Sequence, residues 1–92
     1  MKRTVTFNIN RDMLSHLINF AAKHGIDFGD YSVRPMKIRT RVTVTVARSV
    51  MYALYDKAYE YMMDGNDYIP YSETHRALYG HYPYRLPCQV NR

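Results

Sequence analysis

The side chains best suited to chemistry in this chain lie in its last third. His75, His81 and Cys88 offer the nitrogen and sulfur ligands that zinc binds, and a cysteine near a histidine can also form a thiol nucleophile. Their spacings match no zinc module and no fourth ligand is evident. Cys88 also lies in a proline-flanked tail, where its position would be poorly fixed. We therefore predict no metal site and interpret Cys88 as a free thiol.

Acidic residues give no better case for catalysis. Asp56, Glu60 and Asp64 follow one another at four-residue spacing, which places them on one surface of a helix. A solvated helix surface, with Lys57 nearby, explains this pattern without any reaction. The sequence has no glycine-rich phosphate loop between a strand and a helix, and no paired acid and base signature. We predict no catalytic residue and no cofactor, and therefore a binding protein and not an enzyme.

The elements expected to position these side chains follow a repeated pattern, in which a basic alternating strand runs into an amphipathic helix. Residues 2–25 align with residues 39–62 at an offset of 37 positions. The identical pairs are Val5 and Val42, Thr6 and Thr43, Arg11 and Arg48, Leu17 and Leu54, and Ala21 and Ala58. Two interpretations stay open: an internal duplication with a pseudo-two-fold axis, or two unrelated units that share one binary pattern.

Apolar periodicity sets the boundaries of the first unit. Residues 3–9 alternate as a half-buried strand, with Val5, Phe7 and Ile9 on one face. Asn10 is expected to cap the following helix, which ends at Gly25. Residues 26–36 read as a long connection that can include a short extended piece at residues 31–34.

The second unit repeats the order and then adds one element. A strand is predicted over residues 37–46 and a helix from Ser49 to Gly65. Ser72 is expected to cap a short third helix that Gly80 closes, followed by an extended arm. The fold class is therefore α+β, a compact β-α-β-α two-layer domain with a short third helix. The single domain spans residues 1–92, with a folded core at 1–80 and the arm at 81–92.

Length and composition limit the kind of protein this is. A domain of 92 residues buries only about 60 to 65% of the surface of its unfolded chain, so a homo-oligomer is expected. The single cysteine fits a reducing compartment, and no window approaches the roughly 20 apolar residues of a membrane span. We expect a soluble cytoplasmic protein that makes no membrane contact.

Positive charge is concentrated in the first half of the chain. Residues 1–48 hold nine Lys and Arg against three Asp, within a net charge of +5. The basic residues predicted to meet an acidic partner are Lys2, Arg3, Lys37, Arg39, Arg41 and Arg48. If the strands pair, short Thr and Asn side chains lie beside them and suit a close nucleic-acid backbone. The alternative is a solvated face whose charge prevents aggregation.

The sequence departs from two known classes of nucleic-acid-binding domain. The absence of aromatic residues from the basic strand face argues against the RNA-recognition motif, which stacks bases on its sheet. The start of the chain resembles ribbon-helix-helix DNA-binding proteins, but residues 26–46 occupy the place of their second helix.

Tyrosine is the other unusual feature, with ten in the chain and no tryptophan. Tyrosine is favoured in protein interfaces because it joins a large contact area to a polar tip. The tyrosines predicted to form such an interface are Tyr52, Tyr59, Tyr68 and Tyr71. A small domain could also use tyrosines as core and rim, and that alternative stays open.

Three runs resemble one protein family in order and approximate spacing. They are Val5, Thr6, Phe7, Asn8, Ile9 and Asn10 leading to Met13; then Ser49, Ala53, Leu54, Asp56, Glu60 and Tyr61; then Thr74, Arg76, Leu78 and Tyr79. Together they resemble the small early protein of T-odd enterobacterial podophages that antagonises the host nucleoid protein H-NS. Residues 26–37 and the tail from His81 onward do not match.

The resemblance implies a phage host-takeover protein that acts in the bacterial cytoplasm. Such a protein binds H-NS and interferes with its oligomerisation and gene silencing. Association with transfer RNA is also implied by the family, and no catalytic residue is carried over. Two alternatives stay open: a basic RNA-binding or DNA-binding module that does not contact H-NS, and a small enzyme or metal protein built around His75, His81 and Cys88.

Overall fold

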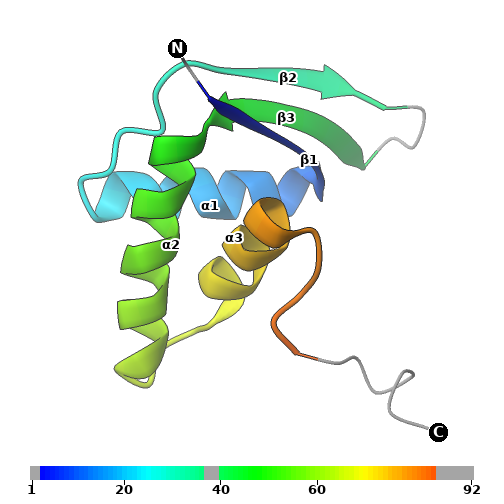
Figure 1. The fold of residues 1–92 in the computed structure, drawn as a ribbon. Helices are drawn as coiled ribbons and strands as arrows, with labels where there is room; N and C mark the ends of the chain where they lie inside the picture. The colour runs from blue at the N-terminus through cyan, green and yellow to red at the C-terminus, as the bar shows by residue number, and fades with distance from the viewer. Residues whose placement is uncertain (1–2, 37–39, 85–92) are drawn as a thin grey trace, which may run out of the picture.

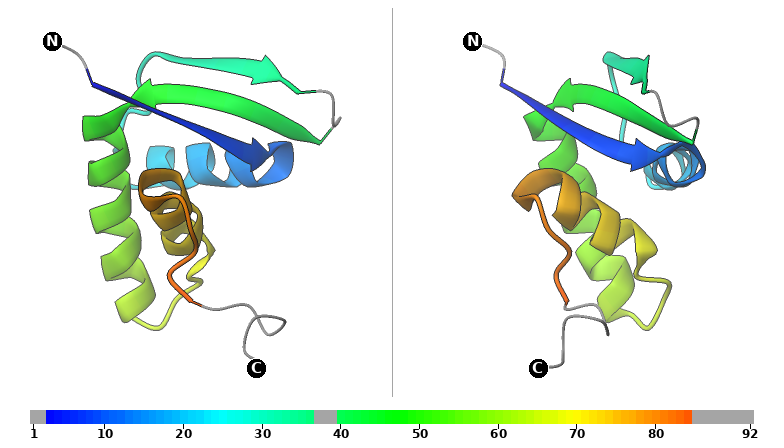
Figure 2. Two further views of the ribbon diagram at one scale, coloured as in Figure 1. Left: turned by 45° about the vertical axis from the view of Figure 1, so that its right-hand side comes forward. Right: turned by 90° about the vertical axis from the view of Figure 1, so that its right-hand side faces the viewer.

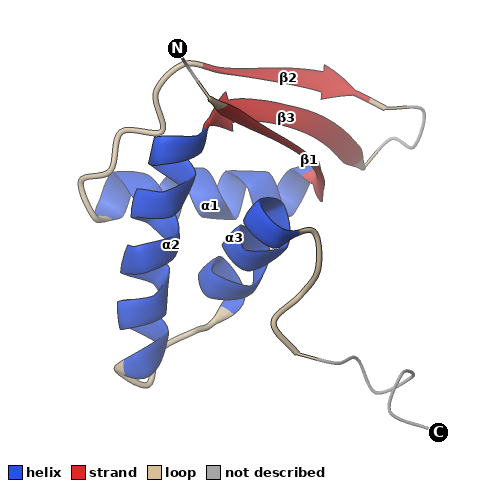
Figure 3. Cartoon of the chain, viewed as in Figure 1, coloured by secondary structure: helices blue, strands red, loops and turns tan. Residues whose placement is uncertain are grey.

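The computed structural model describes residues 3–36 and 40–84, and shows two layers, a sheet and a set of helices (Figures 1 and 3). The elements are β1 (Thr4–Asn10), α1 (Arg11–Lys23), β2 (Tyr31–Pro35), β3 (Arg41–Ala47), α2 (Arg48–Met63) and α3 (Ile69–Tyr79). The predicted α+β class is confirmed. The extended piece expected within the long connection is the strand β2, which makes the sheet three-stranded.

The sheet has the order β1-β3-β2, and both of its strand pairs are antiparallel. Phe7 lies opposite Val44 in the β1–β3 ladder. These two residues are also equivalent in the repeat, since they are 37 positions apart. The ladder is therefore symmetric about the Phe7–Val44 pair, and each strand leads directly into its helix. This is the arrangement that a pseudo-two-fold axis requires.

Alternation in the strands builds the core. Val5, Phe7 and Ile9 are buried on the inner face of β1, and the inner face of β3 is buried as well. The buried residues that meet them from β3 and the helices are Val42, Val44, Val46, Leu14, Leu17, Phe20, Ala21, Met51, Leu54 and Ala58. The apolar stripes predicted for the first two helices therefore face the sheet.

Of the predicted capping residues, Asn10 and Gly80 end their helices as expected and Ser72 does not. The side chain of Asn10 accepts a hydrogen bond of 2.8 Å from the N–H of Asp12, as the predicted cap requires. Gly80 ends α3 with a φ of +83°, a conformation that favours glycine. Ser72 does not cap α3 as predicted. The helix begins three residues earlier at Ile69, whose N–H donates to Asp67 at 3.0 Å, so Ser72 is buried inside the helix.

The segment after α3 turns back onto that helix. The hydroxyl of Tyr82 donates to the carboxylate of Glu73 at 3.0 Å, and the guanidinium of Arg76 lies 5.5 Å from the Tyr82 ring centre. Residues 81–84, the start of the predicted arm, therefore pack against α3. The rest of the predicted arm lies outside the described residues. None of the helices in the described ranges is long and apolar enough to cross a membrane.

Candidate functional site: two binding surfaces

The first candidate surface is the side of the sheet that faces away from the helices. We call it the outer sheet face, and define it as Thr4, Thr6 and Asn8 of β1, Ser32 and Arg34 of β2, and Arg41, Thr43 and Thr45 of β3. The three strands contain no Asp or Glu in their sequences. The face therefore combines two arginines with short hydroxyl and amide groups, and its strands bring no opposing carboxylate.

Hydrogen bonds between strands hold these short side chains in rows. The hydroxyls of Thr6 and Thr45 are 3.0 Å apart, and the hydroxyl of Thr43 donates to Oδ1 of Asn8 at 2.7 Å. Arg34 extends the second row, because it lies opposite Thr43 across the β2–β3 ladder. Because these paired side chains are short, they protrude little from the middle of the face and are evenly spaced along it. A polymer with a phosphate backbone could approach such a face closely.

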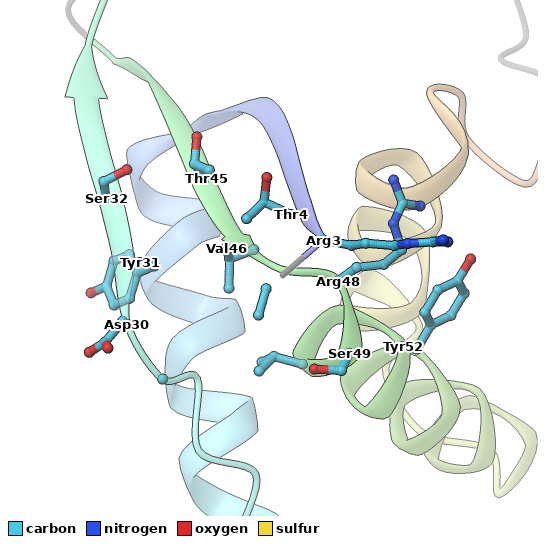
Figure 4. Close-up of a pocket in the computed structure, with 13 residues that line it drawn as sticks. Arg3, Thr4, Asp30, Tyr31, Ser32, Thr45, Val46, Arg48, Ser49 and Tyr52 are labelled. Carbon is cyan, nitrogen blue, oxygen red and sulfur yellow. The ribbon is translucent and has the colours of Figure 1, made fainter. Parts of the chain in front are cut away.

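A hollow of about 910 Å³ opens where β1 begins and α2 starts. The side chains of Arg3 and Arg48 lie next to each other on one side, with Tyr52 beyond them (Figure 4). A backbone hydrogen bond of 2.9 Å from Arg48 to Arg3 fixes this neighbourhood. Asp30 and Tyr31 line the opposite side. Among the described residues, no carboxylate forms a salt bridge with either arginine.

The structure brings together some of the predicted basic residues. Arg3 and Arg48 are neighbours, and Arg41 lies on the outer sheet face at the far end of β3. Lys2, Lys37 and Arg39 lie outside the described residues. The predicted strand over 37–46 begins at Arg41 in the described part of the chain. Sequence reasoning missed Arg34, because β2 is only five residues long and exposed along its whole length.

The second candidate surface is an aromatic cluster across α2 and α3. We call it the tyrosine surface, and define it as Tyr55 and Tyr59 of α2 with Tyr71, His75 and Tyr79 of α3, together with Tyr52, which lies one turn before Tyr55 on α2 and also lines the hollow. The ring centres of Tyr55 and Tyr71 are 5.3 Å apart, and those of Tyr59 and Tyr71 are 5.7 Å apart. His75 and Tyr79 are 4.8 Å apart. These separations are typical of favourable aromatic pairs.

The tyrosine surface combines a packed base with exposed rings. Tyr55, Tyr71 and His75 are half-buried, while Tyr52, Tyr59 and Tyr79 are exposed. The hydroxyls of Tyr55 and Tyr71 lie 3.5 Å apart, and this hydrogen bond, followed by burial, raises the pKa of Tyr55. The Tyr55 hydroxyl is therefore protonated near neutral pH. The surface is uncharged at its centre, as protein interfaces commonly are.

Only some of the tyrosines predicted to form an interface lie together in the structure. Tyr52, Tyr59 and Tyr71 belong to the tyrosine surface, whereas the aromatic contact of Tyr68 is with Tyr84 at 5.9 Å. Tyr55 and Tyr79 were missing from the prediction. A signal existed in the sequence, because Tyr52, Tyr55 and Tyr59 follow the three-to-four spacing of one helix face.

The residues first considered for chemistry do not assemble into a metal site in the described ranges. The rings of His75 and His81 are 5.2 Å apart, yet Nδ1 of His75 lies 2.9 Å from the carbonyl oxygen of His81. Nδ1 of His81 lies 3.0 Å from the carbonyl oxygen of Tyr82. Within residues 3–36 and 40–84, no three His, Cys, Asp or Glu side chains form a group able to hold a metal ion. Cys88 is outside those ranges.

Comparisons with protein-family models, with curated proteins and with solved structures find no match to this chain.

Proposed function

We propose that this protein is a non-enzymatic host-takeover factor that binds H-NS and interferes with its oligomerisation and gene silencing. The observation that carries the proposal is the tyrosine surface, an exposed aromatic patch built on a packed base. Tyrosines in such patches often dominate protein binding, because they desolvate a large area at a small loss of side-chain entropy. The partner is taken from the resemblance to the podophage early protein.

The position of the tyrosine surface also supports a protein partner. It lies in the half of the chain that follows residue 48, where four Lys and Arg stand against five Asp and Glu. Asp56 and Glu60 are exposed on the same helix as Tyr59. A nucleic-acid backbone would be repelled by these carboxylates. The surface is better suited to a protein whose contact residues are apolar or basic.

The second candidate function is direct binding of nucleic acid, of the transfer RNA type or DNA. The specific observation in its favour is the outer sheet face, where Arg34 and Arg41 accompany hydroxyl and amide groups on strands that contain no carboxylate. Arg3 and Arg48 at the hollow add two further positive charges close to the start of β1. Both functions can coexist, since the two surfaces lie on different layers of the domain.

Affinity purification from a bacterial lysate, with and without nuclease, separates the two functions. The double variant Tyr59→Ala and Tyr79→Ala should lose H-NS and keep nucleic acid. The matched variant Arg34→Ser and Arg41→Ser should keep H-NS and lose nucleic acid. All four residues are exposed, so these variants should retain the fold. Capture of H-NS that disappears after nuclease treatment would refute direct binding.

A further inference from the structure

The two edge strands of the sheet, β1 and β2, differ in how far the rest of the chain covers them. Arg48 donates to the backbone oxygen of Arg3, and Arg11 donates to that of Thr40, so odd-numbered residues of β1 pair with β3. The N–H and C=O of even-numbered residues, among them Asn8, therefore point to the free edge. Arg76 of α3 donates to the backbone oxygen of Asn8, and α3 lies beside β1 (Figure 2). The β1 edge is partly covered by the chain itself.

The β2 edge lies at the opposite side of the sheet, farthest from α3 (Figure 2). The N–H of Met36 donates to the oxygen of Arg41, so even-numbered residues of β2 pair with β3. The N–H and C=O of Tyr31 and Val33 therefore point outward. Within the described ranges, no backbone hydrogen bond uses these outward groups. An edge of this kind pairs readily with another strand unless something protects it.

Side chains offer β2 little protection. Val33 is 42% exposed, although it lies on the inner face beside Val44, which is 0% exposed. Tyr31 is exposed on the same face. The sequence of β2 contains no lysine, and its one charged residue, Arg34, and its proline, Pro35, stand at the end of the strand. The devices that commonly block an open edge are thus absent from the middle of β2.

We propose that β2 is a homodimerisation strand, which pairs antiparallel with β2 of a second copy of this chain. The two-fold axis passes through Ser32, so Tyr31 of each copy lies opposite Val33 of the other. In this register the outward N–H and C=O of both residues are all satisfied, because each opposed pair exchanges two hydrogen bonds. Pro35 falls beyond the paired segment, so its missing N–H is not needed.

Charge complementarity favours this register over pairings in which the two β2 strands are shifted along each other. With the axis at Ser32, Asp30 of one copy lies opposite Arg34 of the other, and symmetry forms the pair twice. Opposite charges facing each other across a sheet are favourable, and like charges are not. On the inner face, the Tyr31 ring meets the Val33 side chain, which is a favourable aromatic and β-branched pair. The contact covers apolar surface that the helices leave exposed.

The contact is small, so the dimer should depend on protein concentration. Light scattering should show a mass that rises from 10.9 kDa toward about twice that value as the chain is concentrated. Val33→Pro removes an N–H that faces solvent in the monomer, so it should leave the β2–β3 ladder intact. The variant loses one hydrogen bond per copy, and its dimer dissociation constant should rise about tenfold to a hundredfold. Val33→Thr keeps the N–H and should dimerise as the parent does.

Two further variants test the register. Arg34→Glu should abolish the dimer, and Asp30→Lys added to the same chain should restore it. In a Cys88→Ser background, Ser32→Cys should form a disulfide between copies, since non-hydrogen-bonded pairs bring Cα atoms to about 4.5 Å. Val33→Cys should not, because its two-fold mate is displaced by two residues and lies about 8 Å away. A chain that stays monomeric at high concentration, or a dimer that persists in Val33→Pro and does not cross-link at position 32, would overturn the proposal.

Discussion

Leu54→Ala should destabilise the fold strongly. Leu54 is 0% exposed and lies in the middle of α2, in the cluster that joins the helices to the sheet. The substitution removes three buried carbon atoms, worth about 0.8 kcal/mol each on transfer, and leaves a cavity as well. We expect a loss of about 3 kcal/mol, within the range of about 2 to 5 kcal/mol that such substitutions span.

That loss is large for a chain of 92 residues, whose total stability should be about 5 to 14 kcal/mol. It should lower Tm by about 12 to 24 °C, which thermal unfolding followed by circular dichroism would detect. Urea unfolding should give a lower midpoint with an unchanged slope. Met63→Ala is the matched control, because Met63 is 64% exposed on the same helix and should change stability by less than about 1 kcal/mol. Equal Tm values for Leu54→Ala and the parent would refute the packing of α2 described above.

Three further predictions test other parts of the structure. Arg34→Ser with Arg41→Ser should reduce the slope of log K against log salt for nucleic-acid binding by about 1.4 to 1.8, and an unchanged slope would remove the outer sheet face from that function. Thr74→Val should lose about 1 kcal/mol of stability in urea unfolding, since the buried Thr74 hydroxyl donates to the carbonyl oxygen of Pro70 at 2.7 Å; a neutral result would show that this bond contributes nothing. Burial, and then the carboxylate of Glu73, raise the pKa of Tyr82 above its usual value of 10.0, so the protonated phenol is favoured in the folded state. Tyr82 therefore makes its full contribution to the free energy of unfolding below pH 10, and this contribution falls as the pH rises above 10. The free energy of unfolding of Tyr82→Phe should therefore decrease less steeply above pH 10 than that of the parent.

Much of the fold could be predicted from apolar spacing. The alternation of Val5, Phe7 and Ile9 identified β1, and the amphipathic pattern of the helix predicted from Ser49 to Gly65 identified α2, because both patterns reflect burial on one face. β2 was predicted only as a possible extended piece, since it has five residues, both of its faces are exposed, and its apolar alternation is limited to Tyr31 and Val33. The start of α3 was misplaced because Ser72 is a common capping residue, whereas Asp67 accepts the hydrogen bond there.

The candidate surfaces were harder to predict than the fold. Charge along the sequence identified Arg3, Arg41 and Arg48, but not that Arg3 and Arg48 become neighbours, which depends on the β1–β3 register. The tyrosine surface forms where α2 and α3 pack together, so Tyr71 meets Tyr55 through tertiary contact and not through sequence spacing. Local sequence patterns therefore predict the helices and strands, whereas the two surfaces depend on contacts between residues far apart in the sequence.

The most direct test of the proposed function is the size of H-NS assemblies in solution without nucleic acid. Purified H-NS and this protein, both treated with nuclease, are mixed at increasing ratio and measured by size-exclusion chromatography with light scattering. The parent protein should reduce the mass of the H-NS oligomers, and the Tyr59→Ala and Tyr79→Ala double variant should not. An H-NS mass distribution that stays the same at excess parent protein would contradict the proposal, and direct nucleic-acid binding would then become the leading function.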